Sequence, residues 1–111
     1  MATITTHVLD TARGQPARGV AVTLEAIDGG GARVIASGAT DDDGRCKTLT
    51  VGGVPAGVYR LGFDTGAYFV RLGTEAFFPR ASIEFVVKDA GAHFHVPLLL
   101  SPFGYSTYRG S

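Results

Sequence analysis

The sequence has one cysteine, no surplus of charge and no long apolar segment, and each of these absences excludes a class of protein. A single cysteine, Cys46, cannot form an intrachain disulfide, so nothing requires an oxidising compartment. Ten basic residues balance ten acidic ones, and without a run of Lys or Arg the chain offers no electrostatic footprint for nucleic acid or an anionic membrane. The absence of charge repulsion mildly favours self-association.

No apolar run approaches the roughly 20 residues that a membrane-spanning helix needs. The first residues, Met1 to His7, lack the basic start and apolar centre of a signal peptide. We therefore expect a soluble cytoplasmic protein that binds neither nucleic acid nor a membrane.

The length and composition fit one folded domain spanning residues 1–111. A chain of 111 residues with 45% hydrophobic and 18% charged residues can bury one core but not two independent ones. No linker, internal repeat or low-complexity segment divides it.

Short segments with alternating apolar residues recur along the chain. The clearest is 20–27, where every second residue is apolar and β-branched residues are common, which predicts a strand. Three glycines at 29–31 break this pattern, and residues 33–39 resume as a hairpin partner. Further strands are predicted at 4–9, 58–63, 82–88, 93–100 and 105–109.

Only one stretch has helical spacing. Asp64 or Thr65 is placed to cap a helix over 67–72, and Gly73 to end it. Many short strands separated by turns and a single short helix predict an all-β, two-sheet sandwich.

The segment from His93 to Leu100 carries the strongest local signal. Alternation sends His93 and His95 to one face of the strand and the apolar residues to the other. A histidine pair with this spacing suits a metal, but no carboxylate or thiol at ligand spacing completes the set, so we expect no metal. Pro97 lacks a backbone donor and suggests an edge position or a bulge.

The other candidate groups are weaker when taken alone. A lone histidine such as His7 is more often structural or solvated than catalytic. The acidic run at 41–43 resembles a calcium loop but lacks the downstream Glu, so we interpret it as a turn that delivers Arg45 to the next strand. Cys46 has the sequence context of a buried small residue, not of a nucleophile.

The chain is strand-like up to its last residue, and three of its segments match a known family. The segment from His93 to Ser111 resembles the C-terminal signature of 5-hydroxyisourate hydrolases, which end in Tyr-Arg-Gly-Ser. Thr6-His7-Val8-Leu9-Asp10 with Gly14-Gln15-Pro16-Ala17 resembles the family's N-terminal motif, and Asp43-Gly44-Arg45-Cys46 its middle motif. The resemblance therefore covers the chain from end to end.

This resemblance implies a transthyretin-like β-sandwich, assembled as a homotetramer around a central channel. It also implies that His7, Arg45, His95 and Tyr108 line the channel and that the chain end, with Ser111, closes over the substrate. The hormone carrier transthyretin lacks these histidines and the Tyr-Arg-Gly-Ser end, so the resemblance favours an enzyme over a carrier.

The implied reaction is hydrolysis of the cyclic amide of 5-hydroxyisourate in urate breakdown, giving a ring-opened ureido-imidazoline. The forked guanidinium of Arg45 suits a planar substrate rich in carbonyl groups and can stabilise an oxyanion. Either His7 or His95 can take a proton from water while the other donates to the leaving nitrogen, and the sequence does not assign the two roles.

Tyr108 and Ser111 complete the expected site by orienting water or substrate, and Tyr108 joins His7 and Arg45 in binding the substrate. No metal or organic cofactor is expected. The alternative functions are a transthyretin-like module that binds a small aromatic ligand without turnover, and a purely structural sandwich domain.

Overall fold

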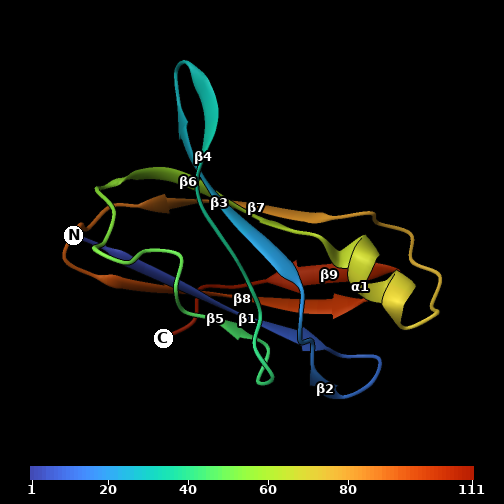
Figure 1. The fold of residues 1–111 in the computed structure, drawn as a ribbon. Helices are drawn as coiled ribbons and strands as arrows, with labels where there is room; N and C mark the ends of the chain where they lie inside the picture. The colour runs from blue at the N-terminus through green and yellow to red at the C-terminus, as the bar shows by residue number, and fades with distance from the viewer.

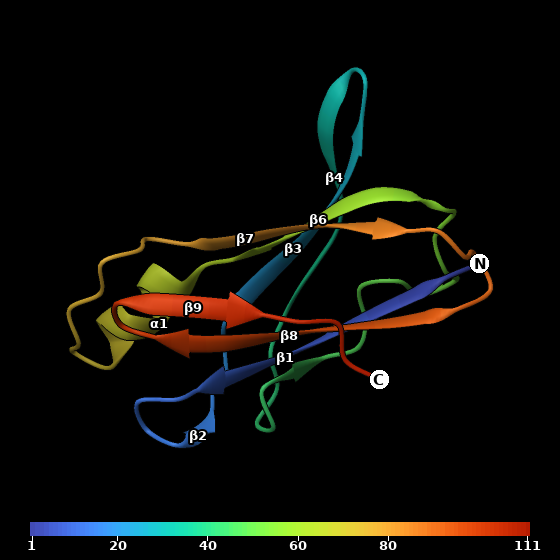
Figure 2. The same ribbon diagram turned by 180° about the vertical axis from the view of Figure 1, so that it is seen from behind.

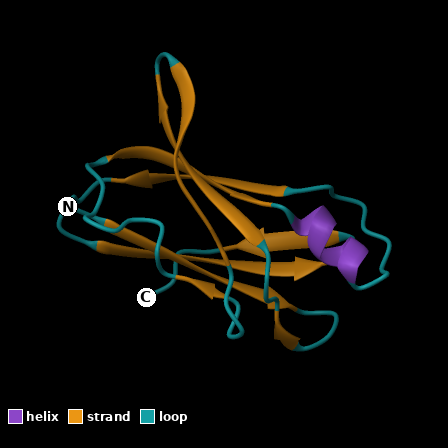
Figure 3. Cartoon of the chain, viewed as in Figure 1, coloured by secondary structure: helices purple, strands orange, loops and turns teal.

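The computed structural model describes residues 1–111 as two β-sheets packed face to face, with one short helix at one end (Figures 1 and 3). The first sheet has the strand order β2-β1-β8-β9, with β5 also paired to β1, and the second has the order β4-β3-β6-β7. The elements are β1 (Thr3–Asp10), β2 (Gln15–Pro16), β3 (Ala21–Asp28), β4 (Gly31–Ala39), β5 (Arg45–Cys46), β6 (Gly57–Phe63), α1 (Thr65–Arg71), β7 (Ala81–Val87), β8 (His93–Ser101) and β9 (Gly104–Thr107).

The core lies between the two sheets and is filled by the alternate residues of their strands. Ile4 and Val8 of β1 and Leu98 of β8 are fully buried from one sheet, and Leu24 and Leu61 from the other. Each such side chain contributes roughly 1.5–3 kcal/mol by leaving water. The predicted sandwich and its seven main strands are therefore confirmed, and Cys46 is buried as expected.

The helix begins where the sequence indicates. The Asp64 carboxylate accepts a hydrogen bond from the backbone N–H of Ala67, and Gly73 follows the last turn with a φ of 67°. The buried hydroxyl of Tyr68 donates to the carboxylate of Asp10 at 2.8 Å and thereby fixes α1 to the end of β1.

The chain end differs from the prediction. The strand expected at 105–109 ends at Thr107, and pairing with β8 resumes only as a single bridge between His95 and Gly110. The edge position suggested by Pro97 is wrong, because β8 lies between β1 and β9. The proline is tolerated because it falls just beyond the last regular β8–β9 pair, between Leu98 and Thr107.

The strands β2 and β5 were not predicted as strands, although Arg45 was placed at the start of one. Each has only two residues, which is too short for any periodicity. Both pair with β1, and β5 sets His7 directly opposite Arg45.

The two ends of the chain meet in the first sheet. β1 and β8 run side by side in parallel (Figures 1 and 2). In their register Thr5 lies opposite His95. The helix α1 does not have the length and apolar character that crossing a membrane would require.

Gly44 holds β5 against β1 at close range. Its carbonyl accepts the backbone N–H of Val8 at 2.7 Å, its φ is 75°, and a Cβ at this position would come within 2.5 Å of the Val8 carbonyl oxygen. A side chain is therefore excluded both by backbone conformation and by space.

We predict that Gly44→Ala destabilises the protein more than Gly14→Ala. Gly14 also has a positive φ, of 67°, but open space around it, so its substitution should cost roughly 1–2 kcal/mol from conformation alone. Gly44→Ala should add about 1–3 kcal/mol of overpacking. Urea unfolding of both variants at one protein concentration measures the difference, and equal losses would show that the close approach to Val8 is unimportant.

Candidate active site

The outer face of the first sheet brings together three of the predicted site residues. On β1 the buried positions Ile4, Thr6 and Val8 alternate with Thr5 and His7, which point outward. Because partners across a ladder lie on the same face, His7 shares this face with Arg45 of β5.

His95 reaches the same face from β8. Its neighbours Phe94 and Val96 are buried, whereas His95 is half-buried. The ring centroids of His7 and His95 are 6.5 Å apart, with 38° between the ring planes. Two imidazoles and one guanidinium from three strands therefore form one cluster, which we call the His-Arg cluster (His7, Arg45 and His95).

The electrostatics of this cluster favour an uncharged His95. Burial lowers the pKa of His95 below its ordinary value, and the positive charge of Arg45 lowers it further, followed by smaller effects of His7 and His93. A base that stays unprotonated near neutral pH can accept a proton from water.

Arg45 owes its position to the acidic turn before it. The Asp41 carboxylate accepts the backbone N–H groups of Asp43 and Arg45, and these bonds, the one from Arg45 first, lower the pKa of Asp41. The run at 41–43 is thus a turn that leads into β5, as the sequence indicated. The Arg45 side chain itself is exposed.

Two threonines of β1, which the sequence interpretation missed, hold the histidines of β8. The Thr5 hydroxyl lies 2.8 Å from Nδ1 of His95 and 3.1 Å from Nε2 of His93. The Thr3 hydroxyl lies 2.7 Å from Nδ1 of His93. The pattern Thr3-X-Thr5-X-His7 could have indicated this role, since alternation places all three side chains on one face of the strand.

The end of the chain reaches His95, whereas Tyr108 makes no hydrogen bond or ring contact with the cluster within one protomer. The Gly110 N–H donates to the His95 carbonyl at 2.8 Å, and a Cβ on Gly110 would meet Cδ2 of the His95 ring at 2.7 Å. Ser111 follows directly and is exposed. Tyr108 instead lines a pocket of 220 Å³ together with the core residues Phe94 and Val96.

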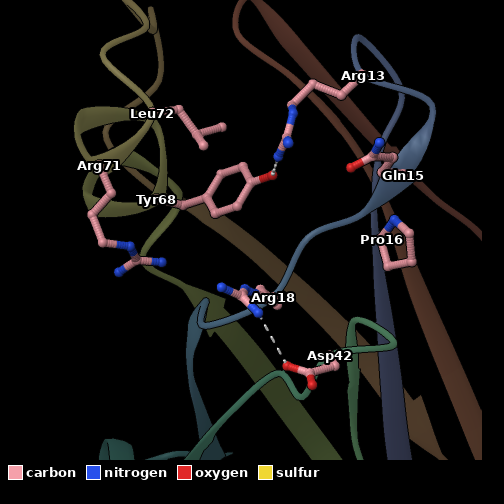
Figure 4. A pocket seen from close by; sticks show the side chains of 8 residues that line it. All are labelled: Arg13, Gln15, Pro16, Arg18, Asp42, Tyr68, Arg71 and Leu72. Atoms are coloured by element: carbon pink, nitrogen blue, oxygen red, sulfur yellow. Dashed lines mark hydrogen bonds and ion pairs between the residues drawn. The ribbon is translucent and has the colours of Figure 1, made fainter.

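The largest pocket, of 520 Å³, lies away from the histidines and contains none of the predicted site residues (Figure 4). It is formed by the segment before β3 and by α1, and three of its lining residues are arginines. No group of three or more His, Cys, Asp or Glu side chains suited to a metal is present.

Comparisons of the sequence with known proteins all point to the same family. The model of the HIUase/Transthyretin family matches residues 4–110. The 5-hydroxyisourate hydrolase of Ralstonia nicotianae is 46% identical over 117 aligned residues, which cover 100% of both chains.

Solved structures give the same result. The 5-hydroxyisourate hydrolase of Klebsiella pneumoniae is 46% identical, with a TM-score of 0.88 over 98% of this chain and 99% of its own. Sea bream transthyretin in complex with thyroxine is 35% identical, with a TM-score of 0.91 over 97% of this chain and 94% of its own.

We predict that Arg45→Gln raises the pKa of His95. Removing the guanidinium removes a positive charge that disfavours imidazolium, while burial continues to hold the pKa below its ordinary value. Titration of the histidine ring signals by NMR measures the change. Lys47→Gln, an exposed cation two residues away, serves as the control, and an unchanged His95 titration in folded Arg45→Gln would contradict the electrostatic account.

Proposed function

The chain belongs to the HIUase/transthyretin family, and we propose that its His-Arg cluster hydrolyses the cyclic amide of 5-hydroxyisourate in urate breakdown. Full-length relatives at 42–46% identity are 5-hydroxyisourate hydrolases, and the chain is an enzyme of this kind. The observation that carries the assignment of the site is the convergence of His7, Arg45 and His95 on one face.

Within this site we assign the base to His95 and the acid to His7. The lowered pKa of His95 keeps its imidazole neutral, so it can take a proton from water while the hydroxide oxygen bonds to the substrate carbonyl carbon. Arg45 stabilises the oxyanion that forms. As the carbon–nitrogen bond breaks, protonated His7 donates a proton to the leaving ring nitrogen, and solvent restores both histidines. The proposed reaction uses no metal or organic cofactor.

The proposed site also includes Tyr108 and Ser111. Ser111 adjoins Gly110, which contacts the His95 ring, so its hydroxyl or carboxylate can orient water or substrate. Since Tyr108 of the same chain lies with Phe94 and Val96, we propose that a neighbouring subunit supplies the tyrosine that binds the substrate at each cluster.

A homotetramer is the assembly that we propose for such shared sites. The edge strands β7 and β9 lie on the same side of the sandwich with unpaired outer edges (Figure 2), and open edges favour pairing with a second copy. The outer face that carries the His-Arg cluster then remains available for contact between two such pairs. The free thiol of Cys46 suits the reducing cytoplasm, which we include in the proposal.

We predict that His7→Ala, Arg45→Ala and His95→Ala each lower turnover by about 10²-fold or more, since each removes a proton-transfer group or the oxyanion partner. The assay follows the ultraviolet decay of 5-hydroxyisourate freshly made from urate by urate oxidase. Lys47→Gln serves as the matched control and should keep the parental rate.

Two results of this assay would contradict the proposal. If the parental protein does not accelerate the spontaneous decay, the chain is a binding module related to transthyretin and not the hydrolase. If the folded Ala variants keep near-parental rates, the chemistry lies elsewhere on the molecule.

We further predict that subunits complement one another. Co-expression of His95→Ala with Tyr108→Ala should give tetramers in which some sites combine an intact histidine from one chain with an intact tyrosine from another. Activity should then exceed that of either variant alone. Sedimentation establishes the size of the assembly, and a monomer, or a mixed assembly with no gain in activity, would rule out shared sites.

A further inference from the structure

The hydroxyl of Thr5 lies between two imidazoles, and its single hydrogen constrains both of them. It is within hydrogen-bonding distance of Nδ1 of His95 and Nε2 of His93. A hydroxyl has one donor, so when both histidines are neutral it donates to one nitrogen and accepts from the other. The tautomers of His93 and His95 are therefore coupled through Thr5.

Only two arrangements satisfy all three contacts. In the first, Nδ1–H of His95 donates to Thr5, Thr5 donates to Nε2 of His93, and Nδ1–H of His93 donates to Thr3. In the second, every bond is reversed and Nε2 of His95 carries the hydrogen. Only the first arrangement leaves the Nε2 lone pair of His95 free to accept a proton.

We propose that Thr5 and His93 are positioning residues that hold His95 in its Nδ1–H tautomer. This inference rests on the proposed function, in which His95 is the base. When His95 takes a proton at Nε2, its Nδ1–H bond to Thr5 is unchanged, so the surrounding hydroxyls need not reorient during the step. His93 contributes by accepting the Thr5 hydrogen, which keeps a Thr5 lone pair directed at His95.

The test is the tautomeric state of His95, measured from ring ¹⁵N chemical shifts at a pH where both His93 and His95 are neutral. The parental protein should show Nδ1–H. Thr5→Val should raise the Nε2–H population and lower kcat by about tenfold with little change in KM, and Thr5→Ser should restore both values. Thr3→Val, the matched control, should alter the tautomer of His93 more than that of His95.

The tautomer is measured without substrate, so the result tests the positioning role of Thr5 independently of the proposed reaction. An Nε2–H tautomer in the parental protein, or an unchanged tautomer in folded Thr5→Val, would overturn the positioning role even if the protein hydrolyses 5-hydroxyisourate. A shift of tautomer without turnover by the parental protein would leave Thr5 as the positioning residue and overturn the proposed reaction.

The 520 Å³ pocket beside α1 supports a second, independent inference. Figure 4 shows Arg13 reaching the hydroxyl of Tyr68, and Arg18 and Arg71 ending on the other side of the ring. The only acidic residue that lines the pocket is the exposed Asp42, 3.6 Å from Arg18. The buried carboxylate of Asp10 lies behind the Tyr68 hydroxyl and adds a second negative charge, so three cations outnumber two anions around the pocket.

These exposed arginines make few hydrogen bonds to other protein groups. Arg13 makes one long bond, of 3.4 Å, to Tyr68, and Arg71 makes one bond, of 2.9 Å, to the Gly19 carbonyl. Each guanidinium has five N–H groups, and those that face solvent can exchange water for the oxygens of a ligand. Burial and donation to Asp10 raise the pKa of Tyr68, which keeps its hydroxyl uncharged and adds no repulsion toward an anion.

We infer that this pocket binds a phosphate-bearing small molecule. Arg18 and Arg71 approach the same side of the Tyr68 ring from two segments, and their forked donors suit an anion with several oxygens, such as a phosphate group. The volume exceeds the needs of a bare phosphate and falls in the range of organic ligand sites. Leu72 and Pro16 provide apolar wall for the rest of the molecule.

Calorimetry with AMP, inorganic phosphate and adenosine tests this site on the intact protein. We expect one AMP per chain with a Kd below about 1 mM, weaker binding of phosphate, and none of adenosine. Arg18→Gln and Arg71→Gln should each weaken AMP binding at least about tenfold, with melting curves confirming the fold. Arg33→Gln, an exposed arginine outside the pocket, is the control and should bind as the parent does.

Three outcomes would overturn the site. These are no saturable binding of AMP, binding that is unaffected by both pocket substitutions, and equal binding of AMP and phosphate, which would remove the organic part of the ligand. Because Arg18 and Arg71 lie outside the His-Arg cluster, both variants should retain the parental rate of hydrolysis, so loss of AMP binding and loss of activity can be told apart.

Discussion

β1 and β8 pair in parallel from Thr3 opposite His93 to Asp10 opposite Leu100, which joins the two ends of the chain in one sheet. Parallel neighbours cannot be linked by a short hairpin, and here nearly the whole chain, including the second sheet, forms the connection. Thr5 and His95 are 90 residues apart in sequence yet in hydrogen-bonding contact. The relative positions of His7, Thr5 and His95 all follow from this one register, and a slip by a single residue would turn the histidines into the core.

Chemistry and packing are separated by the two faces of this sheet. The inner face contributes Ile4, Val8 and Leu98 to the core, which holds the backbone in place. The outer face carries polar side chains, which find hydrogen-bond partners outside the core. His95 lies between these extremes. Its partial burial and the nearby guanidinium of Arg45 favour the neutral ring, and its Nδ1 is held by a threonine instead of a carboxylate. A carboxylate at that place would raise the pKa of the histidine, whereas a hydroxyl fixes the ring with little electrostatic effect.

Local patterns were sufficient for most of the fold. Alternation identified β1, β3, β6, β7 and β8 because each has an apolar face toward the core, whereas β4 and β9 are mostly exposed and were predicted from their position beside turns. Asp64 identified the helix start because its carboxylate caps Ala67. The two-residue strands β2 and β5 could not be predicted in this way, since two residues are too few to show alternation. Pro97 was misinterpreted as an edge signal because a sequence does not show where the pairing of a neighbouring strand stops.

For the candidate site, too, local patterns were sufficient for some features and strand pairing was needed for others. Sequence patterns alone placed His93 and His95 on one face of a strand, and the motifs led to the family. The same motifs gave the site residues proposed here, which are His7, Arg45, His95, Tyr108 and Ser111. The folded structure was needed to show that His7 lies opposite Arg45, that Thr5 bridges two histidines, and that Tyr108 lines a pocket with Phe94 and Val96. The physical reason is that side-chain direction is a local property of a strand, whereas strand pairing and register depend on how distant segments bury their apolar faces together.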